Sequence, residues 1–202
     1  MALKTFVKLN HVTNLSDARY AAGMGVTQLG FSINPDSPNY IDTETMSQIA
    51  DWITGVDIVY ECDTITSLQQ TSAMLNGHTI QLVEVPESLE GLGNETNIII
   101  EQLLEEAINN IRVLQSYGEQ LKYVLLTGEG DTLTNQMIDS ISELASKIPV
   151  VLGFGFNKSS VNNLLEEVNI KGIAIDSSKE IRPGFKDYDH IADILEALEI
   201  ED

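Results

Sequence analysis

The sequence predicts a (β/α)8 barrel that forms a single domain over residues 1–202. Three observations lead to this prediction: strand-like runs alternate with helical patterns, there are eight such runs, and no linker or low-complexity tract interrupts them. Eight units in 202 residues leave about 25 residues each, enough for a strand, a helix and two short turns. An open parallel sheet is the alternative fold.

Each predicted strand is a short apolar or alternating run bounded by turn residues. The eight segments are 5–9, 27–31, 56–61, 79–83, 96–101, 122–126, 149–154 and 172–175. Helix start and stop signals mark residues 14–25, 42–53 and 187–200. The fourth unit is the weakest, because residues 84–95 offer little more than one helical turn.

Composition limits the classes of partner. The formal net charge is −20 and the pI is near 4.2, which argues against nucleic acids and anionic membranes as partners. The N-terminal residues lack an apolar core of signal-peptide length, and no window approaches the ~18 apolar residues of a membrane span. We therefore expect a cytoplasmic protein. Cys62 is the only cysteine, which rules out an internal disulfide and any thiolate metal cluster within one chain. We expect no cofactor.

In a barrel of this kind, functional residues lie at the C-terminal ends of the strands and in the loops that follow. The residues predicted at that rim are mostly acidic or hydroxyl-bearing. They are Lys8, Asn10, His11, Glu61, Cys62, Asp63, Val83, Glu84, Glu101, Thr127, Glu129, Phe154, Gly155, Asp176, Ser177 and Ser178.

Five motifs at these positions resemble the phosphoribosylanthranilate isomerase family, which rearranges a phosphorylated aminosugar in tryptophan biosynthesis. Residues 7–40 follow the family's Lys-Ile-Cys-Gly opening, its Asp-Ala helix, its Leu-Gly-Phe strand and its Ser-Pro-Arg-Tyr turn. Residues 80–84 resemble Gln-Leu-His-Gly and retain Gln81, and residues 151–156 resemble Leu-Ala-Gly-Gly-Leu. Residues 175–187 resemble Val-Ser-Ser-Gly-Val-Glu followed by Pro-Gly-x-Lys-Asp. The resemblance extends over nearly the whole chain and implies the same barrel fold.

The resemblance also implies that the family's catalytic positions are replaced. Its general-base cysteine falls on Asn10, which has no titratable proton, and its general-acid aspartate falls on Thr127. Its turn arginine falls on Asn39 and its histidine on Val83. Losing one acid or base typically lowers a rate by about 10² to 10⁴, so losing both is expected to remove the proton path.

The family's phosphate site is also altered. Of its two glycines after the seventh strand, one is retained as Gly155 and the other falls on Phe154. Its first serine after the eighth strand falls on Asp176, while Ser177 is retained and Ser178 replaces a glycine. An aspartate about 4 Å from a phosphate repels it by about 4 kcal/mol per charge pair at an effective dielectric near 20.

Three functional hypotheses follow, each with a small-molecule ligand at the C-terminal mouth. We favour a functionally diverged or non-catalytic relative of the isomerase. The first alternative is an active isomerase in which His11 or Glu129 has taken over as acid or base. The second is a different, cation-dependent reaction in which Glu61, Glu101 and Asp176 converge on a divalent ion or an amine. The oligomeric state stays open.

Each candidate also has a purely structural interpretation. Asn10 and His11 are expected to cap the helix that begins near Asn14. The acidic rim residues Glu61, Glu101, Glu129 and Asp176 are expected to be solvated loop charges.

Overall fold

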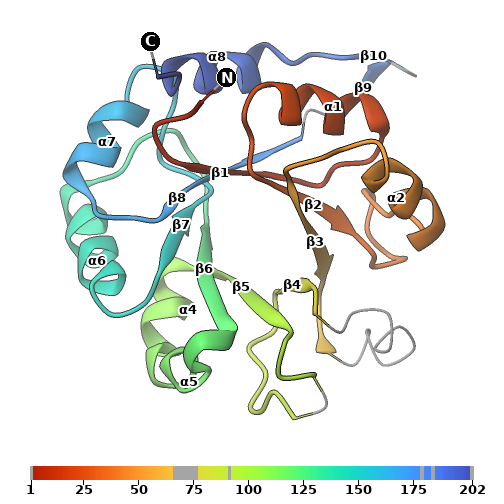
Figure 1. Ribbon diagram of the computed structural model, residues 1–202. Coiled ribbons are helices and arrows are strands. Elements are labelled where there is room, and N and C mark those ends of the chain that lie inside the picture. The colour runs from red at the N-terminus through yellow and green to blue at the C-terminus, as the bar shows by residue number, and fades with distance from the viewer. Residues whose placement is uncertain (1, 66–76, 91, 178–179, 183–184, 201–202) are drawn as a thin grey trace.

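The computed structural model describes residues 2–65, 77–90, 92–177, 180–182 and 185–200. Eight parallel strands pair in chain order, and β1 pairs with β8, which closes the barrel. Figure 1 views the barrel along its axis, with helices around the outside of the strands. The prediction of a closed (β/α)8 barrel is confirmed, and the open sheet is excluded.

The barrel strands are β1 (Phe6–Asn10), β2 (Gln28–Ser32), β3 (Asp57–Cys62), β4 (Thr79–Leu82), β5 (Asn97–Leu103), β6 (Leu121–Thr127), β7 (Val150–Leu152) and β8 (Gly172–Asp176). The α-helices are α1 (Leu15–Gly23), α2 (Thr43–Ala50), α4 (Leu104–Asn109), α5 (Ile111–Ser116), α6 (Asn135–Ala145), α7 (Val161–Glu167) and α8 (Asp189–Ala197). A short 3-10 turn spans Gly118–Gln120, and an antiparallel pair, β9 (Glu180–Arg182) and β10 (Phe185–Lys186), precedes α8.

All eight predicted strands overlap an observed strand, and the three predicted helices correspond to α1, α2 and α8. The described part of the fourth unit, between β4 and β5, contains no helix, as its sequence indicated. The β9–β10 pair was not predicted, because its two short segments lack an apolar alternation.

Side-chain caps fix where several helices begin. The Asn14 side chain accepts from the backbone N–H of Asp17 at 2.9 Å, and Asp42 accepts from Thr45 at 2.8 Å. Each such cap satisfies one backbone donor that the helix leaves open. The predicted capping role of Asn10 and His11 is therefore wrong: Asn14 alone caps α1, and Asn10 is the last residue of β1.

Two apolar clusters stabilise the barrel. The larger one lies between the strands and the helices, and includes Leu9, Leu29, Ile80, Ile98 and Leu126. The smaller one lies inside the barrel and consists of Val59, Ile99, Tyr123, Leu125, Val151 and Ala174. The two clusters use alternate residues of the same strands because successive side chains of a strand point to opposite faces. The inner cluster fills the barrel below its C-terminal mouth.

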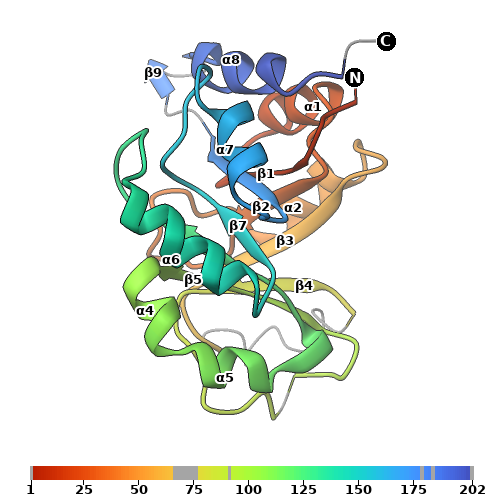
Figure 2. The same ribbon diagram turned by 90° about the vertical axis from the view of Figure 1, so that its left-hand side faces the viewer.

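The chain ends meet on one side of the barrel. Leu3 and Glu199 form an isolated antiparallel bridge, and the N–H of Ile200 donates to the carbonyl of Ala2 at 3.0 Å. Figure 2 shows α8 at the same end of the molecule as α1 and the N-terminus. Within the described ranges, no helix has the length and apolar character needed to cross a bilayer.

Candidate site at the C-terminal mouth

Lys8 is the centre of a hydrogen-bonded network at the C-terminal mouth. Its side chain is fully buried inside the barrel, and its ammonium donates to Asn10 Oδ1 at 2.6 Å, Glu61 Oε1 at 2.6 Å and Gln81 Oε1 at 2.7 Å. An ammonium has three donors and no acceptor, so these three oxygens satisfy it completely. The network thus connects the ends of β1, β3 and β4.

Gly30 on β2 leaves the room that this ion pair occupies. A Cβ atom at Gly30 would lie 1.8 Å from Glu61 Oε1 and 2.8 Å from Lys8 Nζ. Real Cβ atoms do not approach other atoms that closely, so any larger residue would displace the Lys8–Glu61 pair. The glycine of the Leu-Gly-Phe motif is therefore a packing requirement of the site.

Asn10 extends the network to the eighth strand. Asn10 and Asp176 are direct partners in the β1–β8 register, and the Asn10 Nδ2 amide donates to Asp176 Oδ1 at 2.9 Å. The Asn10 side chain therefore has Lys8 on its oxygen and Asp176 on its nitrogen. Both ends of the amide are engaged, and the residue is only 5% exposed.

His11 covers the network from the loop that follows β1. It is the only non-glycine residue with a positive φ (57°) among those described, a left-handed conformation that is uncommon for residues other than glycine. Its backbone N–H donates to Glu61 Oε2 at 3.2 Å. Its Nδ1 lies 2.9 Å from the same oxygen, but the ring N–H is not aligned for a regular hydrogen bond, so the contact is an ion pair.

The network shifts the pKa values of Glu61 and His11. Burial by itself would raise the pKa of Glu61, but the charge of Lys8 and the contact with His11 outweigh it and lower the value to about 2. Burial would lower the pKa of His11, but Glu61, with a smaller contribution from Asp176, raises it above its usual value. Glu61 is therefore a carboxylate at neutral pH, and its charge favours the protonated form of His11.

Glu101 has a different environment. It accepts a hydrogen bond from Gln81 Nε2 at 2.7 Å, and no cation lies within ion-pair distance of it in the described structure. Burial and the negative charge of Glu61 raise the pKa of its carboxyl. The four acidic rim residues thus differ: Glu61 is buried, Glu101 is partly buried, and Glu129 and Asp176 are exposed. The expectation of solvated loop charges is wrong for Glu61.

The acidic residues do not gather around a space for a metal ion. The ammonium of Lys8 occupies the position beside Glu61 that a cation would take, and the Asp176 side chain is 73% exposed. Across the described residues, no group of three His, Cys, Asp or Glu side chains is arranged to hold a metal.

Thr127 and Glu129 lie on the other side of the mouth. Thr127 is the last residue of β6, and β7 and β8 separate this strand from β1. Asn10 and Thr127 thus lie at the same end of the barrel, because all eight strands are parallel. Glu129 follows in an exposed loop and does not line the cavity of the mouth.

The loop after β7 is closed by packing. The Phe154 side chain is buried, and its ring would lie about 3 Å from a Cβ atom at Gly128, in the loop after β6. Gly155 has φ +81°, and a Cβ there would lie 2.3 Å from Leu133. Phe154 therefore fills the space between two loops that glycines would leave open.

Ser177 is committed to the loop after β1. Its backbone N–H donates to the carbonyl of Asn10 at 2.9 Å, and its hydroxyl donates to the carbonyl of His11 at 2.6 Å. Neither donor is left for an anion above the strand. Ser178 lies outside the described residues.

A cavity of about 120 Å³ lies on one side of the mouth, beside the ends of β2, β3, β4 and β5. Small-molecule sites in proteins usually measure about 300–1,000 Å³, so this cavity is small. Its lining is His11, Ser32, Ser37, Glu61, Cys62, Asp63, Gln81, Val83 and Glu101. Asn39 is not part of this lining, and its backbone N–H donates to Ser37 Oγ at 3.2 Å.

Sequence reasoning missed the contributions of β2 and its loop. Ser32 is the last residue of β2, and Ser37 lies five residues further on. The alternation of β2 indicates which residues point inward, because Gly30 and Ser32 are two residues apart. That signal was available in the sequence and would have placed Ser32 at the mouth.

Fold and site together define a single-domain (β/α)8 barrel whose polar residues gather at the C-terminal mouth. The N-(5'-phosphoribosyl)anthranilate isomerase of a Synechococcus species is 26% identical over 219 residues, which include 96% of this chain and 91% of that relative. The isomerase of Microcystis aeruginosa is 28% identical over 217 residues, with 96% and 97% covered. No family model matches the chain.

Solved structures give the same result. The phosphoribosylanthranilate isomerase of Thermotoga maritima superposes with a TM-score of 0.72 at 22% identity, over 96% of this chain and 98% of that one. An isomerase in complex with reduced 1-(o-carboxyphenylamino)-1-deoxyribulose 5-phosphate superposes with a TM-score of 0.69, also at 22% identity, over 96% and 98% of the two chains. The resemblance seen in the sequence is confirmed: these relatives and both of these structural neighbours are phosphoribosylanthranilate isomerases, and they share the barrel fold at low identity.

Proposed function

We propose that this chain is a functionally diverged relative of phosphoribosylanthranilate isomerase that does not catalyse the family's isomerisation. One observation supports this most strongly. Asn10, at the position of the family's general base, is fixed between Lys8 and Asp176 and has no proton to exchange with a substrate. The residue at the position of the general acid is Thr127, whose hydroxyl is a weak acid.

The small volume of the cavity beside His11 and Glu101 supports the same proposal. A cavity of about 120 Å³ is too small for a substrate that joins an aromatic ring to a phosphorylated sugar. Phe154 fills space beside the loop after β6, and both donors of Ser177 bond to β1 and its loop. The exposed carboxylate of Asp176 would also repel a phosphate placed above β8.

A second candidate is residual proton transfer at the mouth, because His11 and Glu101 both line the small cavity and both have raised pKa values. Perturbed titratable groups in one cavity are typical of acid–base sites. The substrate of such a reaction would have to be far smaller than that of the relatives. His11 already forms an ion pair with Glu61, and this contact opposes the transfer of a proton from the His11 ring to a substrate.

Titration with reduced 1-(o-carboxyphenylamino)-1-deoxyribulose 5-phosphate, the compound bound to one structural neighbour, tests the proposal. We expect no saturable binding to this chain up to about 1 mM, measured by calorimetry beside an isomerase that has the family's cysteine and aspartate. Saturable binding that inorganic phosphate displaces would contradict the proposal, because it would require an open phosphate site at the mouth.

A further inference from the structure

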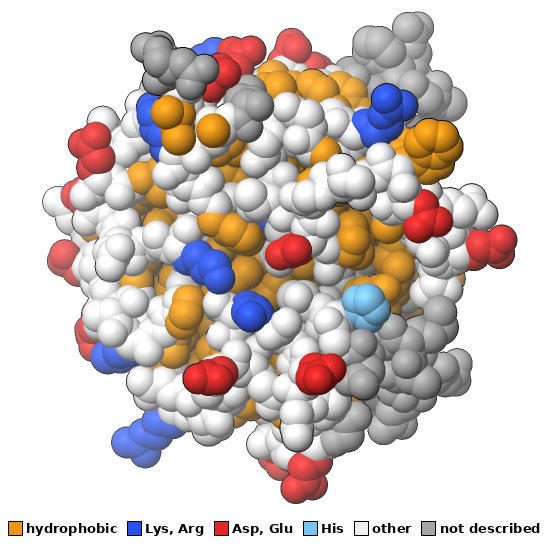
Figure 3. Space-filling model, in the orientation of Figure 1, with side chains coloured by type: hydrophobic (Ala, Val, Ile, Leu, Met, Phe, Trp, Pro, Cys, Tyr) orange, Lys and Arg blue, Asp and Glu red, His pale blue; other side chains and the backbone are white. Residues whose placement is uncertain are grey.

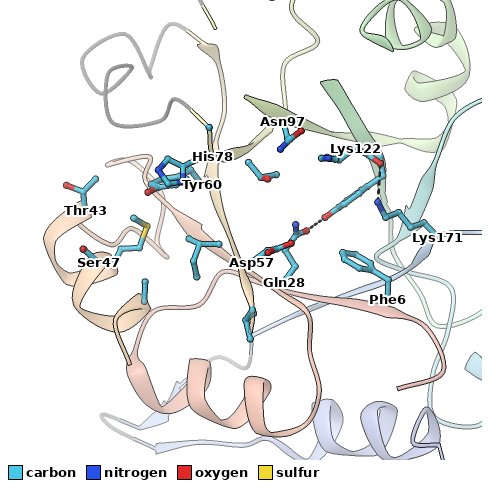
Figure 4. A pocket seen from close by; sticks show the side chains of 17 residues that line it. Phe6, Gln28, Thr43, Ser47, Asp57, Tyr60, His78, Asn97, Lys122 and Lys171 are labelled. Atoms are coloured by element: carbon cyan, nitrogen blue, oxygen red, sulfur yellow. Dashed lines mark hydrogen bonds between the residues drawn. The ribbon is translucent and has the colours of Figure 1, made fainter. Parts of the chain in front are cut away.

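A larger cavity, of about 890 Å³, opens at the opposite, N-terminal end of the barrel. Figure 4 shows its lining, in which the floor comes from the first residues of several strands. Phe6, Gln28, Asp57 and Asn97 belong to β1, β2, β3 and β5, and Tyr123 belongs to β6. This floor is fixed by strand pairing and is separated from the C-terminal mouth by the apolar cluster inside the barrel.

Two lysines lie side by side on this floor. The ammonium of Lys171 lies 5.5 Å from the centroid of the Phe6 ring and 5.2 Å from that of Tyr123, and it donates to the carbonyl of Lys122 at 3.4 Å. In Figure 4 the two side chains occupy the same side of the cavity. The aromatic rings hold Lys171 in place, because a cation over a ring face is attracted by its quadrupole.

Neither lysine forms an ion pair with a carboxylate in the part of the chain that the structure describes. Among the described residues, the ion pairs within 4.0 Å involve Lys8, His11, Lys147 and Lys158, but not Lys122 or Lys171. Burial, together with the charge of Lys122, lowers the pKa of Lys171 below its ordinary value. An anion between the two ammonium groups would offset the burial of Lys171 and the repulsion between the two lysines.

The remaining lining restricts the kind of anion. Among the described residues of the lining, Asp57 is the only carboxylate, so two lysines face one aspartate and the net positive charge is small. A monoanion suits this balance better than a phosphate dianion. Apolar side chains from α2, from β3 and from the residue just before β3 form the other side of the cavity, namely Met46, Ala50, Ile58 and Val56. Figure 3 shows basic side chains beside an acidic one near the centre of this face, among hydrophobic side chains.

We propose that the N-terminal face of the barrel is a binding site for a small organic carboxylate with an apolar body. The carboxylate lies against Lys122 and Lys171, and the apolar body lies against the Met46, Val56 and Ile58 side of the cavity. The site is independent of the mouth and of the function proposed for it.

A pair of probes with the same body and opposite charge tests the proposal. The 202-residue protein, labelled with ¹⁵N, is titrated at low ionic strength with 3-phenylpropionate and separately with 3-phenylpropylamine. Backbone amides at Lys122, Lys171 and Asp57 report on the site. We expect 3-phenylpropionate to shift these amides with a dissociation constant of about 1–10 mM, and the amine to leave them unchanged.

Substitutions then test the charges separately. Lys122→Gln and Lys171→Gln each weaken 3-phenylpropionate about threefold to tenfold, and Asp57→Asn strengthens it about twofold to fivefold. Lys147→Gln is the matched control and should leave the affinity unchanged. Lys147 is an exposed lysine that pairs with Glu143 of α6 and is not part of the cavity. The Lys122 and Asp57 side chains are exposed, so these variants are expected to fold.

Three results would overturn the proposal. The first is that 3-phenylpropionate shifts none of these amides up to about 50 mM, well above the expected dissociation constant. The second is equal binding of 3-phenylpropylamine, which would show that charge does not select the ligand. The third is a dimer in sedimentation equilibrium whose dissociation is required before the amides respond, because a second copy would then occupy the cavity.

Discussion

At the C-terminal end of the barrel, the ammonium of Lys8 donates to three oxygens and is fully buried. At the N-terminal end Lys122 and Lys171 face a cavity, and neither forms an ion pair with a carboxylate among the described residues. The cavities at the two ends measure about 120 Å³ and about 890 Å³. Glu61 neutralises the charge of Lys8 at the C-terminal end, and no described carboxylate forms an ion pair with the two lysines at the N-terminal end. The network around Lys8 stabilises the barrel, whereas Lys122 and Lys171 are the residues that we propose to bind a ligand.

The contrast predicts its largest effect at Lys8. Lys8→Met removes the cation and leaves Glu61 buried without its partner, which should lower the free energy of unfolding by about 3–5 kcal/mol. Urea denaturation followed by circular dichroism measures the change. Lys147→Met, at an exposed ion pair on α6, is the control and should leave the midpoint nearly unchanged. Similar effects for both variants would show that the buried network does not stabilise the mouth.

Lowering the pH should weaken the same network and so lower the stability of the protein. The pKa of Glu61 in the folded protein is about 2, below its ordinary value of 4.5, so its contribution to stability is complete above about 4.5 and disappears as the pH falls through about 2. Denaturation curves between pH 6 and pH 2 should therefore show a fall in stability that is shallower in Glu61→Gln. An identical slope in the variant would mean that Lys8 and His11 do not lower this pKa.

Gly30 offers a test of the packing around the ion pair. Gly30→Ala places a methyl group where Glu61 Oε1 and Lys8 Nζ lie, which should cost about 1–3 kcal/mol of stability. Gly23→Ala is the matched control, because a Cβ there meets nothing within 4 Å at the end of α1. Thermal unfolding of the two variants compares them. A stable Gly30→Ala protein would show that the pair moves at little cost.

The smallest expected effect concerns His11. Because Glu61 raises its pKa in the folded state, its contribution to stability is complete below 6.5 and is lost as the pH rises through the higher folded value. NMR titration of the His11 ring protons should give a pKa above 6.5, and Glu61→Gln should lower it. A pKa of 6.5 or less in the unmodified protein would contradict the ion pair at Nδ1.

Sequence reasoning placed the strands well because each has a short apolar run between turn residues. It also placed Asn10, Thr127 and Asp176 at the ends of β1, β6 and β8, where the structure has them. The burial of Glu61 could not be predicted, because it depends on contacts with Lys8 and Gly30, which lie on other strands. A charge at a strand end looks the same in sequence whether a distant residue neutralises it or water does.

The cavity at the N-terminal face escaped prediction for a related reason. Lys122 and Lys171 are 49 residues apart, and their meeting depends on how β6 and β8 are placed around the closed barrel. Neither belongs to a motif, and the rim of a barrel is expected to be functional only at its C-terminal end. The positions of the motifs therefore drew attention to the mouth alone.

Turnover of phosphoribosylanthranilate by the purified protein tests most directly whether the mouth has lost the isomerisation. Substrate fluorescence is followed at high protein concentration, beside an isomerase that has the family's cysteine and aspartate. We predict a rate no greater than that in buffer, because Asn10 and Thr127 cannot supply the two proton transfers. Turnover of about one per second, abolished by His11→Ala or Glu129→Gln, would contradict the account and show that substitute residues perform the reaction.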